Sequence, residues 1–232
     1  MECPICRNNS FHQTEVMKKR LIEEWALNPD EVTYINRQQG FYCTSCGSNL
    51  RSMTLADSIM KQFDFQDVFK NFPKSKIGRK LKLLEINEAC GLHPFLTSFK
   101  KYTFANYPDI DIQNLPFEDS TFDIIIHSDT LEHVQNSLLG LQECFRLLKD
   151  GGKLFYTIPI IYGRLTKKRD GLPASYHGTQ EENQGEDFKV WTEYGADFWV
   201  EIIKAGFKEV TLNTLKDLSS LGICAKKLVV IR

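Results

Sequence analysis

The chain has 232 residues, a hydrophobic content of 42%, a charged content of 25% and a formal net charge of -1. This length allows one large α/β domain with at most a small appendage. No apolar run approaches the roughly 18 residues of a membrane helix. A net charge near zero provides no general attraction for the phosphate backbone of a nucleic acid. The first residues lack the basic start and apolar stretch of a secretory signal, so we expect a protein of the reducing cytoplasm.

Four of the seven cysteines form two pairs with two residues between the partners, Cys3 with Cys6 and Cys43 with Cys46. Two such pairs can place four thiolates around one tetrahedral zinc ion at about 2.3 Å, in a closed shell that leaves no position for water. Redox-active thiols are the alternative, which the paired arrangement does not favour. We therefore predict a structural zinc site in a small zinc-ribbon-like module over residues 1–54.

Between and after the cysteine pairs, apolar spacing predicts two helices. The first covers residues 14–27 and ends at Asn28 and Pro29. The second covers residues 55–72, with a possible break near Phe65. Residues 73–78 have the composition of a linker, so residues 55–80 are expected to connect the N-terminal module to a domain over residues 81–232.

The large domain is predicted to begin with a strand over residues 82–86 and a second strand over 102–107. Apolar runs at residues 124–126 and 153–158 are typical of strands that are covered on both faces. Between these two runs, apolar residues at spacings of three and four predict one helix from Leu131 to Leu148, which the glycines after Asp150 end. No helix is expected between the second and third strands, which shortens that unit.

The last third of the chain begins with residues 161–190, which show no clear periodicity and are typical of a functional loop. Residues 194–205 predict a helix that Gly206 ends. Strands are expected near residues 207–212 and 225–231. The sequence therefore predicts an α/β fold that closes with a pair of strands.

The segment from Leu115 to Pro159 resembles the second half of class I methyltransferases that use S-adenosylmethionine. The alternative is a generic βαβ unit of another Rossmann-like protein. The resemblance implies a Rossmann-like sheet that is mostly parallel with an antiparallel last strand. The matching residues are Leu115, Pro116, Phe117, Phe122, Asp123, Leu131, Glu132, His133, Gly151 and Gly152.

Nearly the whole chain is similar to a less studied, type 11-like branch of these enzymes, which has an N-terminal cysteine-rich segment and an atypical glycine motif. Members of this branch have no settled methyl acceptor, so the resemblance implies methyl transfer without naming a substrate. The matching features are Arg51 after the second cysteine pair, the strand from Leu83 to Glu88, the shortened unit from Asp111 to Phe117, and the late segments 194–198 and 205–207.

The resemblance also implies where S-adenosylmethionine binds. The family's glycine-rich turn is replaced here by a turn with one glycine, although asparagine tolerates a positive φ and alanine is small. Asn106 stands near the position of the acid that usually binds the ribose hydroxyls, and Asp109 or Asp111 could supply a carboxylate, with Asp111 the better match. The expected cofactor-binding residues are Glu85, Asn87, Ala89, Gly91, Asn106, Asp111, Leu115 and His127.

Methyl transfer from a sulfonium mainly requires alignment of donor and acceptor, and a base is needed only if the acceptor must lose a proton. His127, Asp129 and His133 lie at or just after the end of the third strand, where this fold places its reacting centre. His127 is the candidate base, and a packing role is its alternative. The expected acceptor contacts in the long loop are Tyr162, Arg164, Tyr176 and His177, unless the loop is a flexible tether.

These features predict methyl transfer from S-adenosylmethionine to an acceptor that we expect to be a small molecule, a glycan precursor or a protein. A nucleic acid such as RNA is possible but not favoured. The zinc module would position the acceptor or a partner. The alternative is a catalytically silent, methyltransferase-like binding or adaptor protein. We expect no membrane partner, and the sequence does not define an oligomeric state.

Overall fold

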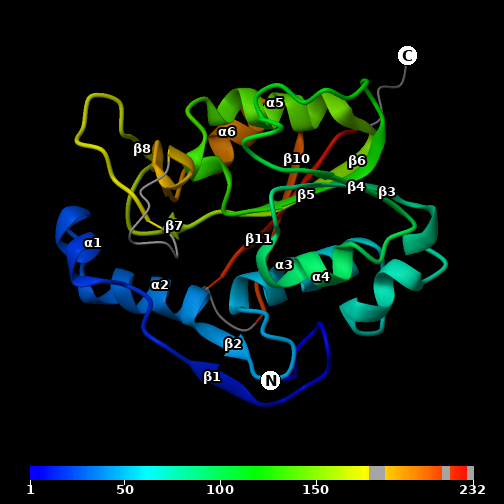
Figure 1. Cartoon of the computed structure of the whole chain (residues 1–232), viewed down its shortest axis with the longest axis horizontal. Coiled ribbons are helices and arrows are strands. Elements are labelled where there is room, and N and C mark those ends of the chain that lie inside the picture. The colour runs from blue at the N-terminus through cyan, green and yellow to red at the C-terminus, as the bar shows by residue number, and fades with distance from the viewer. Residues whose placement is uncertain (178–185, 216–219, 229–232) are drawn as a thin grey trace.

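The computed structural model describes residues 1–177, 186–215 and 220–228 (Figure 1). Its centre is a six-stranded sheet in the order β10-β11-β6-β5-β3-β4, in which β11 runs antiparallel to both of its neighbours. The predicted sheet, parallel at its centre with a reversed last strand, is therefore confirmed. Its strands are β3 (Lys82–Ile86), β4 (Lys101–Ala105), β5 (Phe122–Ser128), β6 (Leu148–Thr157), β10 (Glu209–Asn213) and β11 (Gly222–Lys226).

Helices cover both faces of this sheet, with α5 (Ser137–Leu147) and α6 (Trp199–Lys204) on one side and α3 (Leu50–Gln62) and α4 (His93–Leu96) on the other (Figure 1). Successive side chains of a strand point to opposite faces. Leu84 accordingly packs in the cluster that contains Leu141 of α5, whereas Leu83 packs in the cluster that contains Ile59 of α3. Burial on both faces explains why these strands are continuous apolar runs.

The N-terminal part pairs β1 (Phe11–Gln13) with β2 (Phe41–Cys43), and α1 (Lys19–Glu24) and α2 (Pro29–Gly40) lie between these strands in the chain. The helix expected over residues 14–27 is the shorter α1, which ends at Glu24. Asn28 and Pro29 begin α2, a helix that the sequence analysis did not predict. The Asn28 side chain accepts hydrogen bonds from the backbone of Asp30 and Glu31, both at 2.9 Å, and Glu31 reciprocates on the Asn28 N–H. This capping box stabilises the start of α2.

Two other predicted helices are interrupted. The one expected over 131–148 is a 3-10 turn at Leu131–His133 followed by α5, because Asn136 turns the chain and caps α5 by accepting a hydrogen bond from Leu139 N. The one expected over 55–72 is α3 followed by a 3-10 helix at Phe69–Lys74, so the expected break near Phe65 is present.

The segment after β6 contains more structure than the sequence indicated. Three short strands form a second sheet in the order β7-β9-β8, with bounds β7 (Ile160–Ile161), β8 (Lys167–Lys168) and β9 (Thr192–Gly195). The prediction that a helix starts at Tyr194 was wrong, since Tyr194 belongs to β9 and α6 begins at Trp199. Residues 178–185 of the predicted loop and 229–231 of the predicted last strand lie outside the described residues.

The N-terminal part and the sheet share a hydrophobic cluster. Cys3, Ile5 and Cys43 lie in the same cluster as Leu83 and Ile124 of the central strands. Residue 54, where we predict the end of the zinc-ribbon-like module, falls inside α3, and the boundaries at 54 and 80 remain predictions. Among the described residues no helix is both long and apolar enough to cross a membrane.

Candidate functional site

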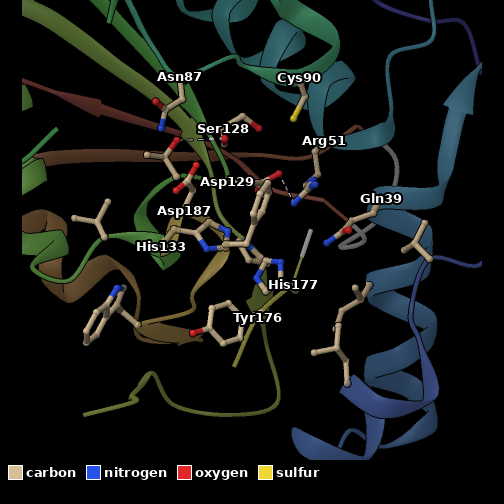
Figure 2. Close-up of a pocket in the computed structure, with 18 of the residues that line it drawn as sticks. Gln39, Arg51, Asn87, Cys90, Ser128, Asp129, His133, Tyr176, His177 and Asp187 are labelled. Carbon is tan, nitrogen blue, oxygen red and sulfur yellow. Dashed lines mark hydrogen bonds and ion pairs between the residues drawn. The ribbon is translucent and has the colours of Figure 1, made fainter. Parts of the chain in front are cut away.

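A cavity of about 1150 Å³ opens at the carboxyl ends of the parallel strands (Figure 2). Asn87 follows β3, Asn106 follows β4, Ser128 ends β5 and Pro159 follows β6, and all four border the cavity. Open α/β sheets bind their ligands at this edge, because the loops that follow parallel strands gather there. The sheet therefore provides one wall of a ligand-sized site.

Segments remote in sequence form the opposite wall. Trp25, Gln39 and several residues between Glu15 and Leu21 come from the N-terminal helices and the chain beside them, and Arg51 comes from the first turn of α3. Tyr176 and His177 come from the segment between β8 and β9. The N-terminal part thus contributes directly to the site.

The turn after β3 is shaped by Glu85, whose side chain is fully buried and does not border the cavity. Its carboxylate accepts a hydrogen bond from Ala89 N at 2.8 Å and from the Tyr102 hydroxyl at 2.5 Å, and it contacts His93 Nδ1 at 3.0 Å. Burial, together with the bond to Glu85, raises the pKa of Tyr102, so its proton stays in this contact. Ala89 is also buried, and Asn87 has a φ of +54°, the conformation expected from its tolerance of positive φ.

Gly91 is the one glycine of this turn, and it lies against the second cysteine pair. A Cβ atom at residue 91 would be 2.7 Å from the Cα of Ser48, a separation that ordinary side chains do not reach. Gly91 does not border the cavity. Its small size is required by the close approach of two backbones.

Asn106 and Asp111 both border the cavity in the stretch that joins β4 to β5, a fully described stretch that contains no helix. Asp111 Oδ1 accepts a hydrogen bond from Gln113 N at 2.8 Å, and its Oδ2 accepts one from Gln113 Nε2 at 3.0 Å. Asn106 Nδ2 donates to its neighbour's carbonyl oxygen at 2.9 Å. Leu115 lies apart from them: it is buried, and its N–H donates to Glu143 Oε2.

His127 lies in the core of the sheet rather than at the cavity. Its ring is fully buried, its centroid is 4.8 Å from that of Tyr156, and neither ring nitrogen has a hydrogen-bond partner. Burial lowers the pKa of His127 to about 3. This placement corresponds to the packing role that the sequence left open.

The four loop residues expected to contact an acceptor divide into two pairs. Tyr176 and His177 border the cavity, whereas Tyr162 and Arg164 do not. Tyr162 packs against Tyr34 with ring centroids 5.0 Å apart. Arg164 instead forms a two-point ion pair with Glu31, at 2.7 and 2.5 Å.

Several cavity residues were missed by the sequence reasoning. Arg51 forms an ion pair with Asp129, which follows β5 in a left-handed conformation with φ of +50°. Asp187, together with Arg20 and Leu21 of α1, also borders the cavity. In the sequence analysis Asp129 was placed just after the third strand, near the reacting centre, whereas nothing local in the sequence places Arg51 opposite it.

The side chains of the four paired cysteines lie close together in the N-terminal part. The Sγ atoms of Cys3 and Cys46 are 3.7 Å apart, those of Cys6 and Cys43 are 3.6 Å apart, and all four lie within 4.8 Å of one another. Four thiolates around a zinc ion at about 2.3 Å would have sulfurs about 3.8 Å apart. The cluster therefore has the donor set and the spacing of a four-cysteine zinc site.

Comparison with known proteins relates the central part of the chain to methyltransferases. Residues 93–156 match the family model described as a methyltransferase domain. A segment of 60 residues is 32% identical to a probable S-adenosylmethionine-dependent methyltransferase of Mycolicibacterium smegmatis, covering 24% of this chain and 23% of that protein. A segment of 48 residues is 46% identical to an uncharacterized protein of Methanocaldococcus jannaschii, covering 21% of each. The chain thus spans less than a quarter of the length of these curated relatives.

Two solved structures with a similar arrangement are described as methyltransferases. The CurJ carbon methyltransferase is 14% identical, with a TM-score of 0.44, covering 91% of this chain and 70% of that one. A Thermotoga maritima methyltransferase, described as a possible histamine N-methyltransferase, is 16% identical with a TM-score of 0.42, covering 75% and 98%.

The family match and the sheet order together confirm the resemblance seen in the sequence. Over residues 93–156 the chain matches the methyltransferase domain family, and the six-stranded sheet to which this segment contributes is Rossmann-like.

Proposed function

We propose that the chain transfers a methyl group from S-adenosylmethionine to an acceptor that binds in the same cavity. The observation that carries this proposal is the cavity at the ends of β3, β4, β5 and β6 in a chain with a methyltransferase domain. At about 1150 Å³ it exceeds the roughly 300–1,000 Å³ of typical ligand sites, so it has room for a donor and an acceptor.

The residues of this cavity fit the cofactor. Asn87 takes the positive φ that the family's turn requires, and it borders the cavity where the methionine part would bind. Asn106 and Asp111 present oxygen atoms that can accept hydrogen bonds from hydroxyl or amino groups of the adenosine part. When bound, the cofactor supplies an electrophilic methyl group. The chain's own residues then orient the two reactants and exclude water.

We also propose that the four cysteines bind one structural zinc ion. Zinc binding of about 10–16 kcal/mol would stabilise a segment with little secondary structure around the cysteines. A closed shell of four thiolates leaves no open position, so the ion would stabilise the fold and not take part in the reaction. None of the seven cysteines, all of which lie in the described residues, forms a disulfide, which supports action in a reducing compartment such as the cytoplasm.

The acceptor that we favour is a small molecule, a glycan precursor or a protein. The site is a concave cavity, and the net charge of -1 supplies no general attraction for a phosphate backbone.

Binding of S-adenosylhomocysteine tests the proposal. At 100 times its dissociation constant, the ligand should stabilise the protein by about 2.7 kcal/mol in a thermal-shift titration. Asp111→Asn should weaken binding about tenfold, because it removes the negative charge from a hydrogen-bond acceptor at the cavity. Asp109→Asn is the matched control, since Asp109 is exposed and outside the cavity. Absence of any response in the unaltered protein would favour the catalytically silent alternative.

A further inference from the structure

Two histidines and a glutamate gather at one side of the cavity. Glu132 and His133 lie in the 3-10 turn after β5, and His177 reaches them from the segment between β8 and β9. Their nearest ligand atoms all lie within 4.8 Å of one another. Figure 2 shows the rings of His133 and His177 next to each other, with a centroid separation of 4.8 Å.

Glu132 is buried without the partners that a buried carboxylate needs. Its side chain is 1% exposed, and neither carboxylate oxygen accepts a hydrogen bond. His133 Nε2 is the nearby nitrogen, at 3.7 Å from Oε1, which is too far for a hydrogen bond. The Nε2 atom of His177 is also buried and unpartnered. Such buried, unpartnered polar groups are unfavourable unless a bound ion or molecule satisfies them.

His133 is oriented as a metal ligand would be. Its Nδ1 lies 3.1 Å from the carbonyl oxygen of Lys189, and a carbonyl can only accept, so Nδ1 carries the proton. Nε2 is then left with a lone pair that points toward Glu132. A second hydrogen bond that fixes the tautomer is typical of metal-binding histidines.

The surrounding charges favour a cation. Asp187 borders the same wall of the cavity, close to His133 in Figure 2. Arg51 is the nearby guanidinium, and it is engaged by Asp129. Lys189 directs its ammonium over the ring of Trp191, at 4.0 Å from the centroid.

We propose that Glu132, His133 and His177 bind one divalent transition-metal ion at the wall of the cavity. Two imidazoles and one carboxylate suit zinc, manganese, iron or cobalt better than magnesium or calcium, which prefer all-oxygen shells. Ligand atoms about 2.0–2.2 Å from an ion lie about 3–3.5 Å apart, so the three side chains need only small rotations to close around it.

Because His133 and His177 border the cavity, the remaining coordination positions face it. If the proposed methyl transfer is correct, an acceptor with a hydroxyl or carboxylate oxygen could bind the ion there. Metal binding itself does not depend on that function.

Cobalt(II) titration tests the site in the full-length protein. The cysteine cluster is first filled with one equivalent of zinc, and cobalt is then added while the absorption spectrum is recorded. We expect saturation at one further equivalent, with weak ligand-field bands and no sulfur-to-cobalt charge transfer. Failure to saturate, or charge-transfer bands alone, would overturn the proposal.

Two substitutions assign the ligands. Glu132→Gln and His177→Gln should each weaken cobalt binding at least tenfold, while His12→Gln, which alters an exposed histidine outside the cluster, should leave it unchanged. Glu132→Gln is nearly isosteric, and circular dichroism checks that each variant is folded. Unchanged affinity in both folded variants would contradict the site. Binding of S-adenosylhomocysteine, measured on the same samples, shows separately whether the methyltransferase proposal stands.

Discussion

Ser48 donates a hydrogen bond from its hydroxyl to the carbonyl oxygen of Gly91, at 3.0 Å. Ser48 is held by the cysteine cluster, because its own carbonyl oxygen accepts from Cys43 N at 3.0 Å. Gly91 belongs to the turn that follows β3 and borders the proposed cofactor site through Asn87. The cysteine cluster and the cofactor turn are therefore in direct contact.

Gly91→Ala should destabilise the protein by about 1–3 kcal/mol, because the added Cβ would overlap the backbone of Ser48. Affinity for S-adenosylhomocysteine should fall as the turn shifts. Gly163→Ala is the matched control, since the atom nearest to its added Cβ would be Glu31 Oε1, at 3.6 Å. Denaturant unfolding and calorimetric titration measure both effects, and equal behaviour of the two variants would contradict the contact.

Cys46→Ser should lower the zinc content by one equivalent per chain and lower the melting temperature, because three thiolates hold the ion less firmly than four. Affinity for S-adenosylhomocysteine should also decrease, because loss of the zinc ion would disturb the contact of Ser48 with Gly91 in the turn after β3. Cys90→Ser provides the comparison for metal content alone, since Cys90 lies outside the four-cysteine cluster but borders the cavity. Elemental analysis gives the metal content; a full zinc complement in Cys46→Ser would show that the cluster is not the binding site.

Arg164→Ala should cost about 3 kcal/mol of unfolding free energy, because Glu31 would remain buried without its ion pair. Arg164 also donates hydrogen bonds to the carbonyl oxygens of Trp25 and Ala26, at 2.7 Å each. Arg79→Ala, at an exposed position, should change the stability by less than about 0.5 kcal/mol. Urea unfolding of both variants measures the difference, and similar losses would rule out a special role for the pair.

His127→Phe should make the protein less sensitive to acid. The pKa of His127 is lowered by burial from 6.5 to about 3, so the unfolded chain binds a proton that the folded protein does not. Stability should therefore fall as the pH drops from about 6.5 toward 3, and the phenylalanine variant should lose that part of the slope. Unfolding followed between pH 7 and 4 tests this, and an unchanged slope would contradict the buried, neutral histidine.

The central strands could be predicted from the sequence because burial on both faces requires continuous apolar runs, as at residues 124–126 of β5. Helix boundaries were harder to predict, because asparagine occurs both after the end of helices and at their start. Asn28 and Asn136 each cap a helix that the periodicity alone merged or missed. A capping box is recognisable only when the glutamate three residues later is read together with the asparagine.

The cavity could be predicted only in part. The residues after β3 and β4 follow from the strand ends, which any parallel sheet brings together. Its far wall depends on contacts between distant segments, such as the hydrogen bond of 2.9 Å from Trp25 Nε1 to Ser175 Oγ. No local pattern encodes such a contact.

Arg164 and Ser175 both form hydrogen bonds with Trp25. These bonds connect the N-terminal helices to the segment after β7, the two parts of the chain that face the strand ends. A wider cavity opening thus requires a joint hinge movement of the N-terminal helices and the segment that contains Arg164 and Ser175. Movement of one loop alone would not open it. The rate at which a bulky molecule enters or leaves the cavity would then depend on the rate of this hinge movement of the N-terminal helices.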